Sequence, residues 1–150
     1  MSKFIYRMQN ILNIKYKLED QAKTEFMLAN QQLQEEEEKL RQLKTRKANY
    51  EETVRQLLRQ NLQIERIKEN QEAIVRMTEF IKEQIECVKE AQHQVDLKAA
   101  KLTELRKERK AQEKLKEKAF EDFLQEENIR ESKEIDELVS FVYGRRQREE

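Results

Sequence analysis

Residues 60–71 read QNLQIERIKENQ, and this stretch separates two long amphipathic segments. On either side of it, apolar residues recur at alternating steps of three and four, which is the spacing of a coiled-coil seam. Inside it the rhythm loses phase, and Asn61 and Asn70, both acceptable at helix ends, bracket the interruption. We therefore predict that the chain reverses direction here.

The apolar residues of each flanking segment form one stripe. The first stripe comprises Phe4, Met8, Ile11, Leu18, Ala22, Phe26, Ala29, Leu33, Leu40, Leu43, Tyr50, Val54 and Leu57, with a predicted stutter from Leu18 to Phe26. The second comprises Ile74, Met77, Ile81, Ile85, Val88, Val95, Ala99, Leu102, Leu105, Leu115, Ala119, Phe123 and Ile129. The pattern predicts an all-α fold, a long antiparallel two-stranded coiled-coil hairpin forming a single domain. Its expected parts are a first helix over about 3–60, a bend over about 61–71, a second helix over about 72–143 and a tail at 144–150.

Composition supports long helices. The chain of 150 residues is 41% charged and 37% hydrophobic, with no proline and one glycine, so it has little material for turns. Its 31 basic and 31 acidic residues cancel, and no global field recruits nucleic acid or an anionic membrane. One cysteine suits a reducing cytosol, and no apolar run is long enough for a membrane span. We expect a soluble intracellular protein without direct membrane insertion.

Charge favours a hairpin over a parallel dimer. If paired positions sum to about 136, the glutamates at 35–38 face Lys98 and Lys101, and Leu40 lies near Val95. In a parallel dimer the same glutamates would face their own copies, which disfavours that pairing.

No residue pattern indicates an active site or a cofactor, so we expect that the protein is not an enzyme. His93 has no second ligand at metal spacing and is interpreted as a surface histidine. Cys87 has no partner base nearby and is expected to be small and partly buried. Residues 98–118 carry nine basic and four acidic side chains. Because glutamates interrupt them and no aromatics intervene, an intrachain-paired helix face is favoured over nucleic-acid binding.

The apolar run LVSFVY at 138–143 needs a different explanation. In the predicted register, residues beyond about 135 overhang the N-terminus and have no partner on the first helix. The unpaired residues are Leu138, Val139, Phe141, Val142 and Tyr143, beside Phe4, Ile5 and Tyr6, with Gly144 as a possible helix stop. Such a cluster is better explained by a partner's pocket.

Two aromatics lie near the bend. Tyr50 fits the first stripe, which favours core packing. Phe80 lies beside the seam residue Ile81, so an exposed partner-binding patch is about as plausible for it as packing.

Three segments carry a family resemblance. They are FIYRMQNILNIKYKLEDQAK at 4–23, EFIKEQIE at 79–86 and ENIRESKEIDEL at 127–138. With a central reversal between them, the chain resembles the FliJ family of flagellar export proteins over nearly its whole length.

The resemblance implies a non-catalytic central stalk of the bacterial flagellar type III export apparatus. Such a protein docks in the pore of a hexameric export ATPase, FliI, promotes its assembly and activity, and contacts the export gate protein FlhA. Export chaperones are further implied partners. The implied location is the cytoplasmic face of the inner membrane at the flagellar base.

The resemblance also implies two groups of site residues. Candidates for docking in the ATPase ring are Phe4, Ile5, Met8, Ile135, Leu138, Phe141, Val142 and Tyr143. Candidates for binding the export gate are Leu43, Tyr50, Phe80, Gln84, Cys87 and Ala91. The chain departs from the family in having no glycine at the bend and in having Arg46 where the family has a second aromatic.

Two rival interpretations stay open at this point. One is a homodimeric structural coiled-coil scaffold, which would sediment as a stable dimer. The other is a nucleic-acid-binding hairpin that uses residues 98–118, which would show salt-dependent binding.

Overall fold

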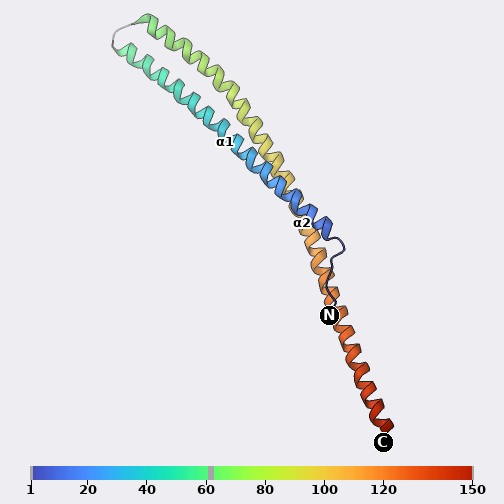
Figure 1. Cartoon of the computed structure of the whole chain (residues 1–150). Helices are drawn as coiled ribbons and strands as arrows, with labels where there is room; N and C mark the ends of the chain where they lie inside the picture. The colour runs from blue at the N-terminus through green and yellow to red at the C-terminus, as the bar shows by residue number, and fades with distance from the viewer. Residues whose placement is uncertain (1, 61–62, 150) are drawn as a thin grey trace. The chain divides into compact units, whose positions relative to one another are not determined.

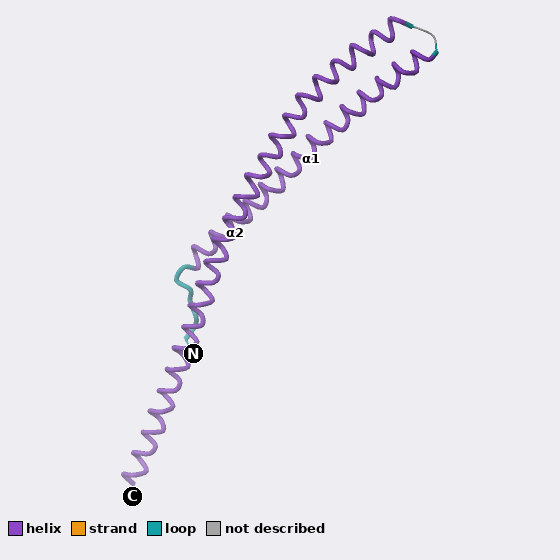
Figure 2. Tube along the Cα trace, turned by 180° about the vertical axis from the view of Figure 1, so that it is seen from behind, coloured by secondary structure: helices purple, strands orange, loops and turns teal. Residues whose placement is uncertain are grey.

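The computed structural model describes residues 2–60 and 63–149, and none of these residues forms a strand. They form two helices, α1 (Gln9–Arg59) and α2 (Ile64–Glu149). Figures 1 and 2 show the helices side by side and running in opposite directions on either side of the reversal. The prediction of an all-α helical hairpin is confirmed.

The helix bounds differ from the predicted ones at three of four ends. The backbone N–H of Gln9 donates to the Tyr6 carbonyl at 3.2 Å, and α1 begins here rather than near residue 3. The second helix begins at Ile64 rather than near residue 72, and the Ile67 N–H donates to the Gln63 carbonyl at 3.0 Å. Ile67 is buried, and its burial in the seam explains why helix forms inside the predicted bend. Of that bend, residues 61 and 62 lie outside the described residues.

The third difference is at Gly144, predicted as a possible helix stop. It lies inside α2, which continues to Glu149, and it does not adopt a positive φ. A glycine within a helix costs only about 1 kcal/mol relative to alanine, and alone it does not end a helix.

The chain divides into two units. One consists of Asp20–Glu104, and its core is a cluster of Leu33, Ala91 and Val95, against which Phe26, Ala29 and Val88 pack. The other combines the residues before Asp20 with those after Glu104. In this second unit the N-terminal residues lie along α2 (Figure 2).

The seam of α1 keeps its heptad phase toward the N-terminus. The residues withdrawn from solvent there are Leu12, Lys15, Glu19, Ala22 and Phe26, at alternating steps of three and four. The predicted seam residues Ile11 and Leu18 are instead 40% and 37% exposed, and the predicted stutter is absent. The reason is electrostatic: Glu19 occupies the seam because arginines of α2 neutralise it.

The seam of α2 also continues through polar residues. Between Val88 and Val95 the buried residue is Ala91, and the predicted seam residue Leu115 is exposed while Gln112 and Lys116 are half-buried. Ile129 is exposed as well. The three seam positions that follow Leu105 are thus filled by Arg109, Gln112 and Lys116, long side chains whose stems pack and whose polar ends reach water or a partner.

The register differs from the predicted one. Val95 packs in the cluster with Leu33 rather than beside Leu40. Lys98 and Lys101 pair with Glu25, at 3.3 and 3.2 Å, rather than with the glutamates at 35–38. Because α1 ends at Arg59 and α2 begins at Ile64, the reversal is much shorter than predicted, and the partners shift accordingly.

Candidate protein-docking surfaces

The far end of α2 carries an apolar surface, here called the tail stripe, formed by Ile135, Leu138, Val139 and Val142. These side chains are between 49% and 63% exposed. Their spacing places them within about 100° of the helix circumference, at 100° per residue. Phe141 and Tyr143, both 65% exposed, flank the stripe. Four large apolar side chains on one exposed face indicate a docking surface.

The tail stripe is out of phase with the hairpin seam. On α2 the seam passes through Leu105, Arg109, Gln112, Lys116, Ala119 and Phe123. Continued in the same rhythm, it would pass through Lys133, Glu137 and Ser140 and would miss the whole stripe. The tail stripe occupies outer heptad positions, on the opposite side of α2, so a longer α1 would not cover it.

The N-terminal candidates for ring docking differ in exposure. Ile5 is 77% exposed, and Met8 is 38% exposed. Phe4 is half-buried, with its ring centroid 5.2 Å from that of Phe120 and 5.4 Å from that of Phe123. Its first role is therefore to hold the N-terminal segment on α2.

The structure does not bring all eight candidates to one level of α2. Ile135 lies twelve residues beyond Phe123, which is about 18 Å at 1.5 Å per residue. The N-terminal group and the tail group are therefore separate surfaces. All of the tail candidates are exposed: Ile135, Leu138, Phe141, Val142 and Tyr143.

The gate candidates of α2 share one face. Phe80, Gln84, Cys87 and Ala91 follow one another at steps of four, three and four. Phe80 is 47% exposed and Ala91 is buried. Cys87, expected to be partly buried, is exposed because it lies beside the seam residue Val88 rather than on the seam. The α1 candidates Leu43 and Tyr50 are half-buried in the seam.

Gln84 already has a structural role. Its Nε2 donates to the backbone carbonyl of Glu36 at 2.9 Å and to the carboxylate of the same residue. This hydrogen bond lowers the pKa of the Glu36 carboxyl, because it stabilises the ionised form. Gln84 therefore ties the two helices together beneath the candidate gate face.

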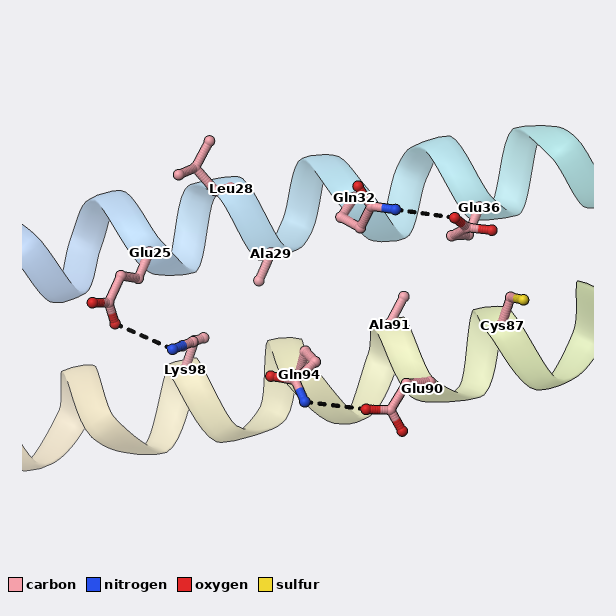
Figure 3. A pocket seen from close by; sticks show the side chains of 10 residues that line it. All are labelled: Glu25, Leu28, Ala29, Gln32, Glu36, Cys87, Glu90, Ala91, Gln94 and Lys98. Atoms are coloured by element: carbon pink, nitrogen blue, oxygen red, sulfur yellow. Dashed lines mark hydrogen bonds and ion pairs between the residues drawn. The ribbon is translucent and has the colours of Figure 1, made fainter.

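An apolar groove of about 570 Å³ continues from this face (Figure 3). Its lining residues are Glu25, Leu28, Ala29, Gln32, Glu36, Cys87, Glu90, Ala91, Gln94 and Lys98. Figure 3 shows Ala29 and Ala91 pointing between the helices and Leu28 pointing away from α2. Leu28 is 60% exposed. The sequence prediction missed Leu28, although its position off the apolar stripe is a signal of exposure.

Basic residues of the 98–118 segment pair with acidic residues of α1. Lys101 and Lys98 lower the pKa of the Glu25 carboxyl by hydrogen bonding and charge. Lys15 in turn reaches Glu108 at 3.0 Å. These contacts agree with the intrachain-paired face that the sequence favoured. Within the described residues, no group of three or more His, Cys, Asp or Glu side chains is placed to hold a metal ion.

An ionic layer centred on the buried Glu19 and completed by Arg106, Arg109, Glu113 and Tyr16 was not predicted. Glu19 is only 3% exposed. Its Oε2 accepts from Arg109 Nε at 2.6 Å and its Oε1 from Arg109 Nη2 at 3.2 Å, while Arg106 Nε lies 3.4 Å away. Hydrogen bonding to Glu19 raises the pKa of the Arg109 guanidinium.

The rest of the ionic layer surrounds Glu113. Arg109 Nη1 donates to Glu113 at 3.0 Å, and the Tyr16 hydroxyl also donates to this carboxylate. That hydrogen bond raises the pKa of Tyr16 and lowers the pKa of Glu113. The signal in the sequence was a glutamate at a seam position with two arginines within reach on α2.

These features define a class of protein: antiparallel helical hairpins that carry exposed apolar surfaces on their helices. Neither helix has, within the described part of the chain, an apolar stretch suited to crossing a membrane. The chain belongs to the FliJ family, because the model of the flagellar FliJ protein matches residues 3–148. Membership makes it a component of flagellar or type III protein export.

The fold has a solved counterpart. The structure of a YscO homologue from Chlamydia trachomatis superposes with a TM-score of 0.80 at 23% identity, covering 99% of this chain and 100% of the other. At this identity the likeness establishes the fold alone. A search of curated protein sequences gives no match.

Proposed function

We propose that this protein is the non-catalytic central stalk of a flagellar export ATPase. In this proposal the far end of α2 docks in the pore of the hexameric ATPase FliI and promotes its assembly and activity. The observation that carries the proposal is the tail stripe, an exposed apolar surface on the opposite side of α2 from the hairpin seam. A helix face that meets no apolar partner among the described residues of its own chain fits a pore formed by another protein.

The stalk acts by unequal contact. A single asymmetric helix inside a ring of six like subunits touches them differently, so it favours nucleotide closure at some interfaces over others. The chemistry belongs to the ATPase, and the stalk supplies differential binding energy. Through the face around Phe80 it contacts the gate protein FlhA, and export chaperones are a further class of partner. In this proposal the stalk works at the cytoplasmic face of the inner membrane, where the gate lies.

Truncating the tail stripe tests ring docking. We expect the double variant Leu138→Ala and Val142→Ala to need about tenfold or more protein for half-maximal ATPase stimulation, because two apolar side chains lose their burial. The measurement is phosphate release by the ATPase over a titration of stalk. Val75→Ala, which truncates another exposed apolar residue of α2, is the matched control. Equal stimulation by both variants would contradict ring docking through the stripe.

The gate contact is tested at Phe80. Phe80→Ala should weaken retention by immobilised FlhA several-fold, because a half-exposed aromatic is a typical binding anchor. ATPase stimulation by the same preparation should be unchanged, since Phe80 is far from the tail. Leu97→Ala serves as the control, because Leu97 is also about half exposed on α2. Normal retention of the Phe80 variant would remove Phe80 from the gate site.

A further inference from the structure

The two ends of the tail stripe carry opposite charge. Glu131 lies four residues before Ile135, and Arg146 lies four residues after Val142, so both lie on the stripe side of α2. Glu134 and Arg145 border the same edge of the stripe, one near each end. All four side chains are exposed. The stripe is therefore apolar in the middle, acidic at one end and basic at the other.

This pattern is complementary to itself when reversed. If two copies pair antiparallel about the midpoint between Leu138 and Val139, Glu131 of each copy lies beside Arg146 of the other. Residues on one edge also meet the same edge of the partner in an antiparallel pair, which brings Glu134 beside Arg145. A parallel pair would instead place Glu131 beside Glu131 and Arg146 beside Arg146.

We propose that the tail stripe is a self-association surface, on which two copies of this chain pair antiparallel through residues 131–146. The apolar residues form the shared seam, and the four charge contacts set the orientation. A two-helix pair of this length is weakly stable. The association is therefore reversible and depends on protein concentration. The stripe cannot bind a second copy and the ATPase at once, so the pair is a resting form from which the ring captures single chains.

Charge reversal at one end tests the proposal with the full-length chain alone. We expect the wild type to pass from a species of 18.3 kDa toward twice that mass as concentration rises in sedimentation equilibrium. Two variants reverse the charge at one end: the acidic-end variant is Glu131→Arg with Glu134→Arg, and the basic-end variant is Arg145→Glu with Arg146→Glu. Each should raise the dissociation constant of the pair roughly tenfold or more, because every attractive charge contact becomes repulsive. Mixing the two variants should restore the pair.

A matched control separates position from net charge. Asp136→Arg with Glu137→Arg makes the same charge change as the acidic-end variant, but outside the stripe, and should associate like the wild type. A wild type that stays at 18.3 kDa at every concentration would overturn the proposal, as would end variants that pair as well as the control. Because the ATPase is absent, either result would leave the ring-docking proposal standing.

Discussion

Removing residues 129–150 is expected to abolish stimulation of the export ATPase and to return its rate to the basal value. The deletion removes the whole tail stripe. Among the described residues of α2 that follow Phe120 and Phe123, the two aromatic contacts of Phe4, this stripe is the only large apolar surface. It leaves the seam between α1 and α2 intact, because the half-buried residues of α2 end at Glu127, and the contact it removes from the N-terminal segment is the hydrogen bond from Arg130 to Ser2. Phosphate release measured at saturating stalk gives the result directly.

Two controls make this deletion informative. Circular dichroism should show the helix content expected for the shortened chain, which establishes that the remaining hairpin is folded. A full-length chain with Arg145, Arg146 and Arg148 changed to alanine keeps the stripe and removes the basic end. It should retain most of the stimulation if apolar docking dominates. A truncated chain that stimulates as well as the intact one would end the stalk proposal.

The hairpin could be predicted because its evidence is redundant. Many residues support the seven-residue rhythm on both sides of the reversal, and the phase from Ala22 to Leu57 was correct. Toward the N-terminus the predicted stripe used Ile11 and Leu18, whereas the seam holds their neighbours Leu12 and the ion-paired Glu19. When a seam position holds an ion-paired charge, a prediction from hydrophobicity alone assigns the seam to the apolar residue next to it.

The register could not be fixed by the same evidence. Sliding one helix by seven residues again places apolar residues opposite apolar residues, so Leu33 and Leu40 are equally good partners for Val95. Specific polar contacts break this degeneracy, and they depend on side-chain geometry that spacing does not contain. The pairing of Glu25 with Lys98 and Lys101 is one such contact.

The end of α2 was predicted to have no partner on α1, and this prediction holds although the predicted register was wrong. The unpaired end of α2 was expected beyond about residue 135, and the shorter reversal makes it begin earlier, since residues 131–148 are all exposed. The apolar tail candidates could be found from composition alone. Their position opposite the seam, however, depends on the seam's true phase.

The ionic layer supplies the prediction with the largest effect on stability. Glu19→Ala should lower the free energy of unfolding by about 2–3 kcal/mol, because it leaves Arg109 partly buried without its bidentate partner. The loss is smaller than for a fully buried pair, since the Arg109 side chain is 20% exposed and can regain some water. Urea unfolding at neutral pH measures the change.

The matched control and the double variant identify the cause. Glu38→Ala removes an exposed ion pair with Arg41 and should cost at most about 0.5 kcal/mol. Glu19→Leu combined with Arg109→Leu replaces the two most buried charges of the layer by apolar side chains. This double variant should recover most of the loss, because the charges that remain, on Arg106 and Glu113, are more exposed. If Glu19→Ala costs no more than Glu38→Ala, the ionic layer is well hydrated in solution. A loss that the double variant does not recover would mean that Glu19 stabilises the seam through contacts other than Arg109.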